Sequence, residues 1–89
     1  MKTLKSTYTE TRELKSDVFV DNYGACTNLS LMLSMSWIGG ELEEVKFIVK
    51  STTDSSYICP FSVDFECYSA ASRYFESKSN FYKDILNYR

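Results

Sequence analysis

The sequence predicts an α+β fold, with an antiparallel sheet of four to five strands and one long C-terminal amphipathic helix packed across one face. Two patterns carry this prediction. Residues 29–38, LSLMLSMSWI, alternate between large apolar and mostly small polar side chains, as a half-buried strand does. Residues 62–88 repeat their apolar side chains with the period of an α-helix. At 89 residues, 44% of them hydrophobic, the chain is expected to form a single domain, 1–89.

Two strands are expected before the central hairpin. Residues 3–14 alternate loosely between threonines and Leu or Tyr, and threonine favours strands. Residues 17–20 contain the apolar run Val-Phe-Val and predict a second short strand. The following residues 21–24, Asp-Asn-Tyr-Gly, are typical of a turn.

The central hairpin is predicted to consist of strands 29–38 and 42–50. A two-residue turn at Gly39-Gly40 would pair Leu33 with Lys46 and so mix apolar with charged faces. A three-residue loop that adds Glu41 keeps the apolar side chains together, and this loop is therefore predicted. It pairs Met35 with Val45, Leu33 with Phe47 and Leu31 with Val49. The expected core consists of these six residues, the helix residues Cys67, Ala71 and Tyr74, and Trp37 near its end.

A short last strand is expected at 57–60, followed by a helix over about 62–88 with Ser62 as its N-cap. Residues 77–80, Ser-Lys-Ser-Asn, are mostly weak helix formers, so one continuous helix and two nearly collinear helices both remain open. A single helix of about 26 residues would be about 39 Å long. A ten-residue strand is only about 33 Å long. The end of the helix is therefore expected to extend beyond the sheet.

The composition excludes several kinds of site. The chain has no histidine, which excludes Ser-His-Asp and Cys-His catalysis and every metal site that needs His. Its three cysteines, Cys26, Cys59 and Cys67, form no C-x-x-C pair, so neither a metal site nor a cofactor is predicted. Whether Cys59 and Cys67 pair is left open. Without a signal peptide or an apolar span of about 18 residues, a cytoplasmic location is expected.

One short pattern resembles a nuclease motif. Asp21 follows the strand 17–20, and Glu44-Val45-Lys46 forms an E-x-K on a later strand. This is similar to the D…E-x-K arrangement of metal-dependent PD-(D/E)xK nucleases. The resemblance implies two carboxylates that hold Mg²⁺ and a lysine that helps to position the attacking water. The predicted hairpin register instead makes Glu44 and Lys46 ordinary solvent-facing residues.

Two surfaces are candidate partner-binding sites. One is the acidic tip of the hairpin, which is either a solvated turn that resists aggregation or a knob that docks on a basic partner surface, such as one that normally holds nucleic acid. The other is the aromatic end of the helix, where side chains are expected to lie beyond the sheet. Together the candidate residues are Glu41, Glu43, Glu44, Phe81, Tyr82, Ile85 and Tyr88.

The favoured function is a small non-enzymatic protein-binding module, alone or as a homodimer, that acts by covering the surface of another protein. Small size and the absence of catalytic motifs fit an inhibitor, for example an anti-CRISPR-like one, that a phage or mobile element encodes against a host or defence protein in the host cytoplasm. The alternative is a weak nucleic-acid-binding protein that uses Lys46, Lys50, Arg73 and Lys83. A net charge of −2 gives this alternative little electrostatic support.

Overall fold

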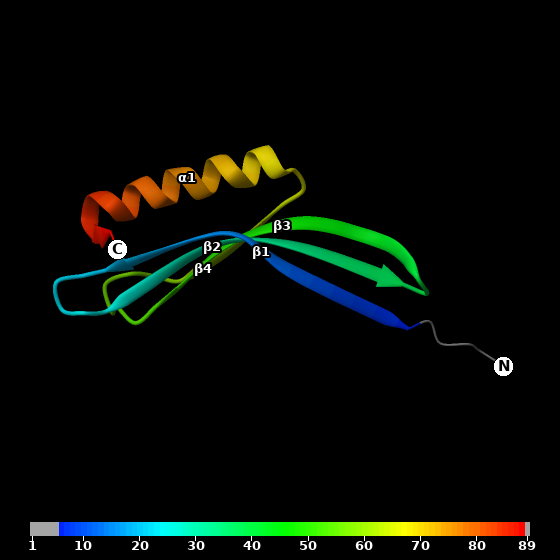
Figure 1. Ribbon diagram of the computed structural model, residues 1–89, viewed down its shortest axis with the longest axis horizontal. Helices are drawn as coiled ribbons and strands as arrows, with labels where there is room; N and C mark the ends of the chain where they lie inside the picture. The colour runs from blue at the N-terminus through cyan, green and yellow to red at the C-terminus, as the bar shows by residue number, and fades with distance from the viewer. Residues whose placement is uncertain (1–5, 89) are drawn as a thin grey trace.

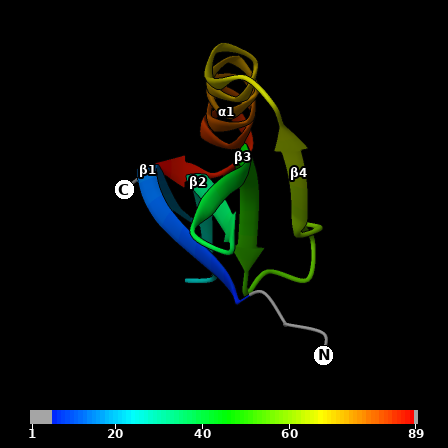
Figure 2. The ribbon, with the colours of Figure 1, turned by 90° about the vertical axis from the view of Figure 1, so that its right-hand side faces the viewer.

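A computed structural model of the 89-residue chain describes residues 6–88, and the side chains of residues 6–86. The elements are β1 (Thr7–Val20), β2 (Cys26–Ile38), β3 (Glu41–Thr53), β4 (Phe61–Phe65), α1 (Tyr68–Ile85) and β5 (Asn87–Tyr88). The strands form one antiparallel sheet in the order β4-β3-β2-β1-β5, and α1 lies across one of its faces (Figure 2). The predicted fold class is confirmed.

The sheet extends beyond the helix, which is the reverse of the sequence-based expectation. β1, β2 and β3 have 14, 13 and 13 residues, whereas α1 has 18. The strands are therefore about 43–46 Å long before twist, and the helix is about 27 Å long. Figure 1 shows the far ends of the three long strands continuing past the start of α1.

The described part of the chain contains no helix with the length and hydropathy needed to cross a membrane.

The buried core lies only under the helix, at the end of the sheet where the β1–β2 turn is found. Its residues are Phe19, Leu29, Leu31 and Val49 of the sheet and Ala71, Phe75 and Tyr82 of α1. Three of the predicted core residues, Leu31, Val49 and Ala71, belong to this cluster. The prediction is wrong for the others: Leu33, Met35, Trp37, Phe47 and Tyr74 are half-buried, and Val45 and Cys67 are exposed. The cause is the shorter helix, which covers a smaller length of sheet than predicted.

The register of the central hairpin is as predicted, but its turn is not. Met35 lies opposite Val45, and the other two predicted apolar pairs also form. The turn, however, has two residues, since Ile38 pairs with Glu41. Both glycines have positive φ, 60° and 85°, as a type I′ turn requires. A bulge at Glu43, between the pairs Trp37–Leu42 and Ser36–Glu44, then supplies the extra residue that restores the apolar register.

The predicted strands 3–14 and 17–20 are one strand. β1 runs from Thr7 to Val20 and has a bulge at Leu14, between the residues that pair with Met32 and Leu31. Residues 3–5 lie outside the described part. The loose alternation over 3–14 and the fresh start at 17 reflect this bulge, which changes the phase of the side chains without ending the strand.

The chain around Pro60 also differs from the prediction. Residues 57–60 form no strand, and β4 occupies Phe61–Phe65, where a helix was expected. In β4 the polar residues Ser62 and Asp64 are exposed, and the apolar residues that alternate with them, Phe61, Val63 and Phe65, are half-buried. This is the alternation of a strand. The N-cap is consequently Cys67 rather than Ser62, and its Sγ accepts a hydrogen bond from the Ala70 N–H at 3.4 Å.

The helix is continuous from Tyr68 to Ile85, so the open question at residues 77–80 is resolved in favour of a single helix. Ser79 in this stretch is buried and hydrogen-bonded to β1, which compensates for its weak helix propensity. The predicted continuation to 88 is wrong. The Leu86 N–H donates to the Tyr82 carbonyl at 2.7 Å, and the chain then turns into the two-residue β5 beside β1.

Candidate protein-binding surface

The half of the sheet that lies beyond α1 carries an apolar surface on the same side as the helix. Tyr68, the first residue of α1, meets Phe47 edge-on with ring centroids 5.7 Å apart, and this contact marks the limit of helical cover. Further along the hairpin, the paired residues of β2 and β3 on this face are apolar, whereas β1 places Glu10 beside Met35 and Arg12 beside Leu33. We call the surface formed by Tyr8, Leu33, Met35, Trp37, Leu42 and Val45 the distal face.

The register assigns these side chains to one face. Trp37 of β2 lies between Tyr8 of β1 and Leu42 of β3, and residues directly opposite one another point to the same side of a sheet. Met35 and Val45 form the next such row toward the helix. The Tyr8 and Trp37 rings touch, with centroids 5.5 Å apart. The distal face is therefore contiguous.

The distal face is substantially exposed to solvent. Tyr8 is 61% exposed, Leu42 52% and Val45 40%, and the other three residues are half-buried. No element within residues 6–88 packs over it, as Figure 1 shows for the far ends of β1, β2 and β3. Contiguous exposed apolar surface that contains Trp, Tyr and Met is typical of protein–protein interfaces.

An acidic rim lies at the hairpin tip, next to the distal face, but Glu41 and Glu44 point to the opposite side of the sheet, because they pair with Ile38 and Ser36. The predicted residues Glu41, Glu43 and Glu44 are all exposed at the hairpin tip. β4 ends opposite Phe47, so no described strand lies beside the first residues of β3, and an open groove of about 560 Å³ occupies this position. Its lining residues are Glu43, Glu44, Val45, Lys46, Asp64, Phe65 and Glu66. Four of its five charged residues are therefore acidic, and Lys46 is held by Asp64 at 3.2 Å and Glu44 at 3.9 Å.

The second predicted surface, the end of the helix, lies at the opposite end of a molecule that is 60 Å long (Figure 1). Phe81 and Ile85 are exposed there, as predicted. The assignment of Tyr82 to a binding surface is wrong, because its ring packs 5.4 Å from that of Phe19 and the residue is buried. Tyr88 lies in β5 opposite Phe19, and its side chain is outside the described part of the structure.

Ile85 also lines a second open groove, of about 480 Å³, between the β1–β2 turn, the loop after β3 and the end of α1. Its lining mixes acidic, basic and aromatic side chains, including Asp21, Tyr57 and Lys83. Asp21 is occupied with its own turn, because its Oδ1 accepts hydrogen bonds from two backbone N–H groups at 2.9 Å. This groove offers no single ligand chemistry, and the predicted acidic and aromatic surfaces do not meet in it.

The residues of the nuclease-like pattern are not brought together. Asp21 follows the end of β1, whereas Glu44 is aligned with Thr9 near the start of β1, through Ser36 of β2. Twelve residues of extended chain separate these positions, roughly 35–40 Å. Among the residues that the structure describes, no three His, Cys, Asp or Glu side chains form a group that could hold a metal ion. The site that the resemblance implies is therefore not assembled.

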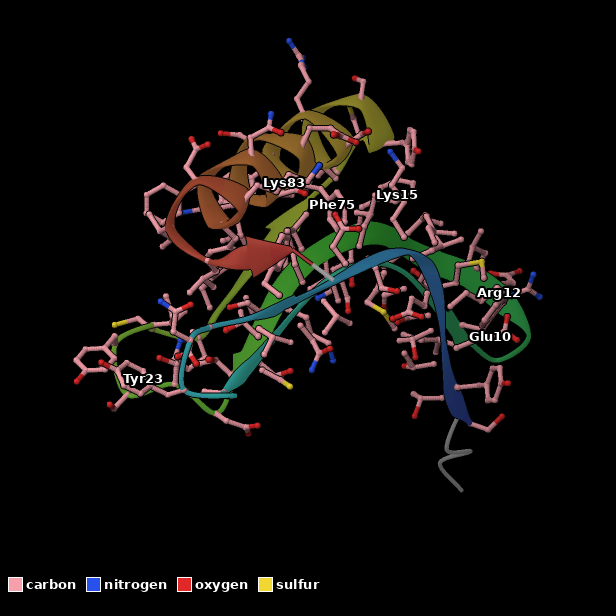
Figure 3. The ribbon with its side chains drawn as sticks, turned by 60° about the vertical axis from the view of Figure 1, so that its left-hand side comes forward. Glu10, Arg12, Lys15, Tyr23, Phe75 and Lys83 are labelled. Carbon is pink, nitrogen blue, oxygen red and sulfur yellow. The ribbon has the colours of Figure 1, made fainter. Side chains whose placement is uncertain are left out.

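The basic residues proposed for nucleic-acid binding also fail to share a surface. Lys46 and Lys50 alternate with the helix-facing residues of β3, so they point to the opposite face of the sheet. Arg73 and Lys83 are on α1, which covers the other face (Figure 3). A nucleic-acid backbone needs a continuous basic track, which these four residues do not provide.

Cys67 is the N-cap of α1 and carries a thiol with a lowered pKa. The Ser69 hydroxyl, 3.0 Å from its Sγ, and the Ala70 N–H lower the pKa of the exposed Cys67 thiol by hydrogen bonding to the thiolate. Cys67 is thus an exposed helix cap whose thiolate form is favoured.

Comparison of the chain with protein-family models, curated proteins and solved structures finds no match. Function is therefore inferred from the surface of this chain. The sequence pointed to the acidic tip but missed the distal face, because the alternation of residues 29–38 and 42–50 is the same whether a helix or solvent covers the apolar side. Length gave the opposite indication, because the predicted helix of about 26 residues is longer than the predicted ten-residue strand.

Proposed function

We propose that the chain is a small non-enzymatic protein-binding module that binds its partner through the distal face. The supporting observation is the exposure of Tyr8, Leu42 and Val45 in one contiguous apolar surface beyond the helix. Removing such surface from water is the main driving force for association. Trp37 and Tyr8 supply the large aromatic side chains that most often dominate binding energy.

The acidic rim specifies the charge of the partner. The negative charge of Glu41, Glu43 and Glu44 would attract a basic surface of the partner and speed the encounter of the two proteins, although Glu41 and Glu44 point away from the distal face. Basic surfaces of this kind are common on proteins that handle nucleic acid. A module that covers such a surface would act as an inhibitor by occlusion, the mode of action proposed above for a protein encoded by a phage or mobile element.

Matched pairs of substitutions test this function. Leu42→Asp with Val45→Asp places two charges on the distal face, and Phe81→Asp with Ile85→Asp places two charges on comparably exposed residues at the other end of the molecule. Affinity capture with the tagged wild-type chain identifies the partner, and titration with the purified partner measures each variant. We expect the distal-face variant to lose at least 100-fold in affinity, or about 2.7 kcal/mol. The control should bind as the wild type does.

The opposite pattern would overturn the proposal: a folded distal-face variant that binds normally while the helix-end variant does not. Circular dichroism of both variants verifies the fold.

Exchanging the three rim glutamates for glutamine should slow association more than it speeds dissociation, because the rim acts on the encounter.

A further inference from the structure

The outer edge of β1 is open over most of its length. β5 pairs with β1 only at Phe19 and Val20, and no other described strand lies along this side of the sheet. Figure 3 shows this edge, with Glu10 and Arg12 far from the helix. Open edges present backbone donors and acceptors that readily pair with another strand.

The register identifies which backbone groups point outward. The Gly39 N–H donates to the Ser6 carbonyl at 2.9 Å, so this pair bonds across the β1–β2 ladder. In an antiparallel ladder, bonded and non-bonded pairs alternate. Tyr8, Glu10 and Arg12 therefore direct their N–H and C=O groups toward β2. Thr7, Thr9, Thr11 and Glu13 direct theirs outward, to the open edge.

The charges on this edge are symmetric about Thr11. Glu10 and Arg12 flank it on one face of the sheet, where they form an exposed ion pair at 3.7 Å. If a second copy of β1 ran antiparallel with Thr11 opposite Thr11, each Glu10 would lie opposite Arg12 of the other copy. The same register sets the exposed Tyr8 opposite the exposed Leu14.

We propose that two copies of the chain pair through their β1 edges, antiparallel and centred on Thr11, into one continuous ten-stranded sheet. The outward groups of Thr11 bond those of Thr11 in the second copy, and those of Thr9 bond those of Glu13. The charged residues then occupy a non-bonded pair, in which opposing side chains are closest. Two copies related in this way form a closed, two-fold symmetric dimer.

Two features confine the pairing to this segment. The bulge at Leu14 interrupts the regular edge on one side of the centre, and β5 already covers Phe19 and Val20.

The two-fold axis is perpendicular to the sheet, so both helices and both distal faces lie on the same side of the dimer. This inference is distinct from the proposed partner binding, because it uses the backbone groups at the edge of the sheet; of the distal-face residues, Tyr8 also lies at the proposed dimer contact.

Charge exchange tests the register. In Glu10→Arg, and equally in Arg12→Glu, the symmetry turns two attractive pairs into two repulsive ones, and we expect dimerisation to weaken at least about tenfold. The double variant Glu10→Arg/Arg12→Glu regains complementary pairs and should dimerise as the wild type does. The two single variants, each of which dimerises weakly alone, should form a heterodimer when mixed. Sedimentation equilibrium over a range of concentrations measures the wild type, the three variants and the mixture.

Crosslinking tests the centre directly, also for a dimer that dissociates on dilution. With Cys26, Cys59 and Cys67 replaced by serine, Thr11→Cys places two thiols on residues whose Cα atoms would be about 5.5 Å apart, within disulfide range. Thr9→Cys is the matched control, because its two copies would be about 14 Å apart along the strands. We expect rapid oxidative dimerisation of Thr11→Cys alone. Equal rates for the two variants would overturn the register, as would folded charge variants that dimerise like the wild type.

Discussion

Ser79 Oγ donates a hydrogen bond of 2.7 Å to Asp17 Oδ2 and thereby joins the middle of α1 to β1. Ser79 is 1% exposed, so its hydroxyl depends on this acceptor rather than on water. The residues around it in the core are apolar, and displacing the helix along the sheet would leave the hydroxyl without a partner. The bond therefore specifies where the helix lies on the sheet.

Removing this hydroxyl should measurably destabilise the fold. We expect Ser79→Ala to lower the free energy of unfolding by about 1–2 kcal/mol, because a hydrogen bond to a charged acceptor is lost inside the structure. Ser77→Ala is the control, since Ser77 is exposed on the same helix and should change stability by less than about 0.5 kcal/mol. Urea unfolding of the two variants checks the prediction, and equal effects would contradict it.

Phe81 and Tyr82 are neighbours with opposite environments. Tyr82 is buried against Phe19, whereas Phe81 is 52% exposed. Tyr82→Ala should cost about 3–5 kcal/mol, the range for deleting a buried aromatic ring, and Phe81→Ala should cost less than about 1 kcal/mol. Thermal or denaturant unfolding gives both values. Similar losses for the two variants would show that Tyr82 is not part of the core.

The two glycines of the hairpin turn should respond differently to substitution. Gly40 has φ of 85°, and a Cβ there would meet no atom within 4 Å, so any cost of Gly40→Ala comes from the backbone. We expect a loss of about 1–2 kcal/mol. Gly39→Asn should be nearly neutral, because Asn-Gly is a preferred type I′ pair and φ at Gly39 is 60°. Unfolding midpoints of the two variants separate these outcomes.

Cys67 should be the fastest-reacting thiol near neutral pH. Hydrogen bonds from the Ser69 hydroxyl and the Ala70 N–H lower its pKa, so more thiolate is present than in an ordinary exposed cysteine. Iodoacetamide labelling followed by peptide mass spectrometry should modify Cys67 before the exposed Cys59. Ser69→Ala should slow the labelling of Cys67 and leave Cys59 unchanged. If Ser69→Ala has no effect, the hydroxyl does not stabilise the thiolate.

The same pKa shift has a defined sign for stability. Because the folded pKa lies below the unfolded one, the thiolate of Cys67 favours the folded state. This contribution is fully present above the unfolded pKa and is lost as the pH falls through the folded pKa. Replacing Cys67 by serine should therefore flatten the dependence of stability on pH in the alkaline range.

Local patterns in the sequence were sufficient to predict the strand pairing of the sheet, but not which part of the sheet the helix covers. The alternation around Met35 and Val45 fixes their pairing, because a slip by one residue would expose every apolar side chain of the hairpin. The bulge at Glu43 could not be predicted, since a longer turn gives the same register. The helical periodicity of residues 62–67 is matched equally well by a strand when Phe61, Val63 and Phe65 alternate with polar residues. Only contact with β3 decides between them.

For a similar reason, the sequence could not distinguish the residues of the distal face from those of the core. Leu31 and Met35 occupy equivalent positions on β2, yet α1 covers only the first. Which end of a sheet a helix covers depends on where the connecting loop leaves it, and here β4 ends at Phe65, opposite Phe47. The Ser79–Asp17 bond spans 62 residues of sequence and has no local pattern.

The bulge at Glu43 also determines where the hairpin can change in length. Trp37 already pairs with Leu42, and Ser36 already pairs with Glu44, so Glu43 is opposite no residue of β2. Deleting Glu43 would join two correctly paired segments and move no apolar side chain to the other side. Deleting Val45 instead would break the match on which the fold depends. We therefore expect the chain without Glu43 to keep its fold and to have a shorter hairpin with a straighter tip.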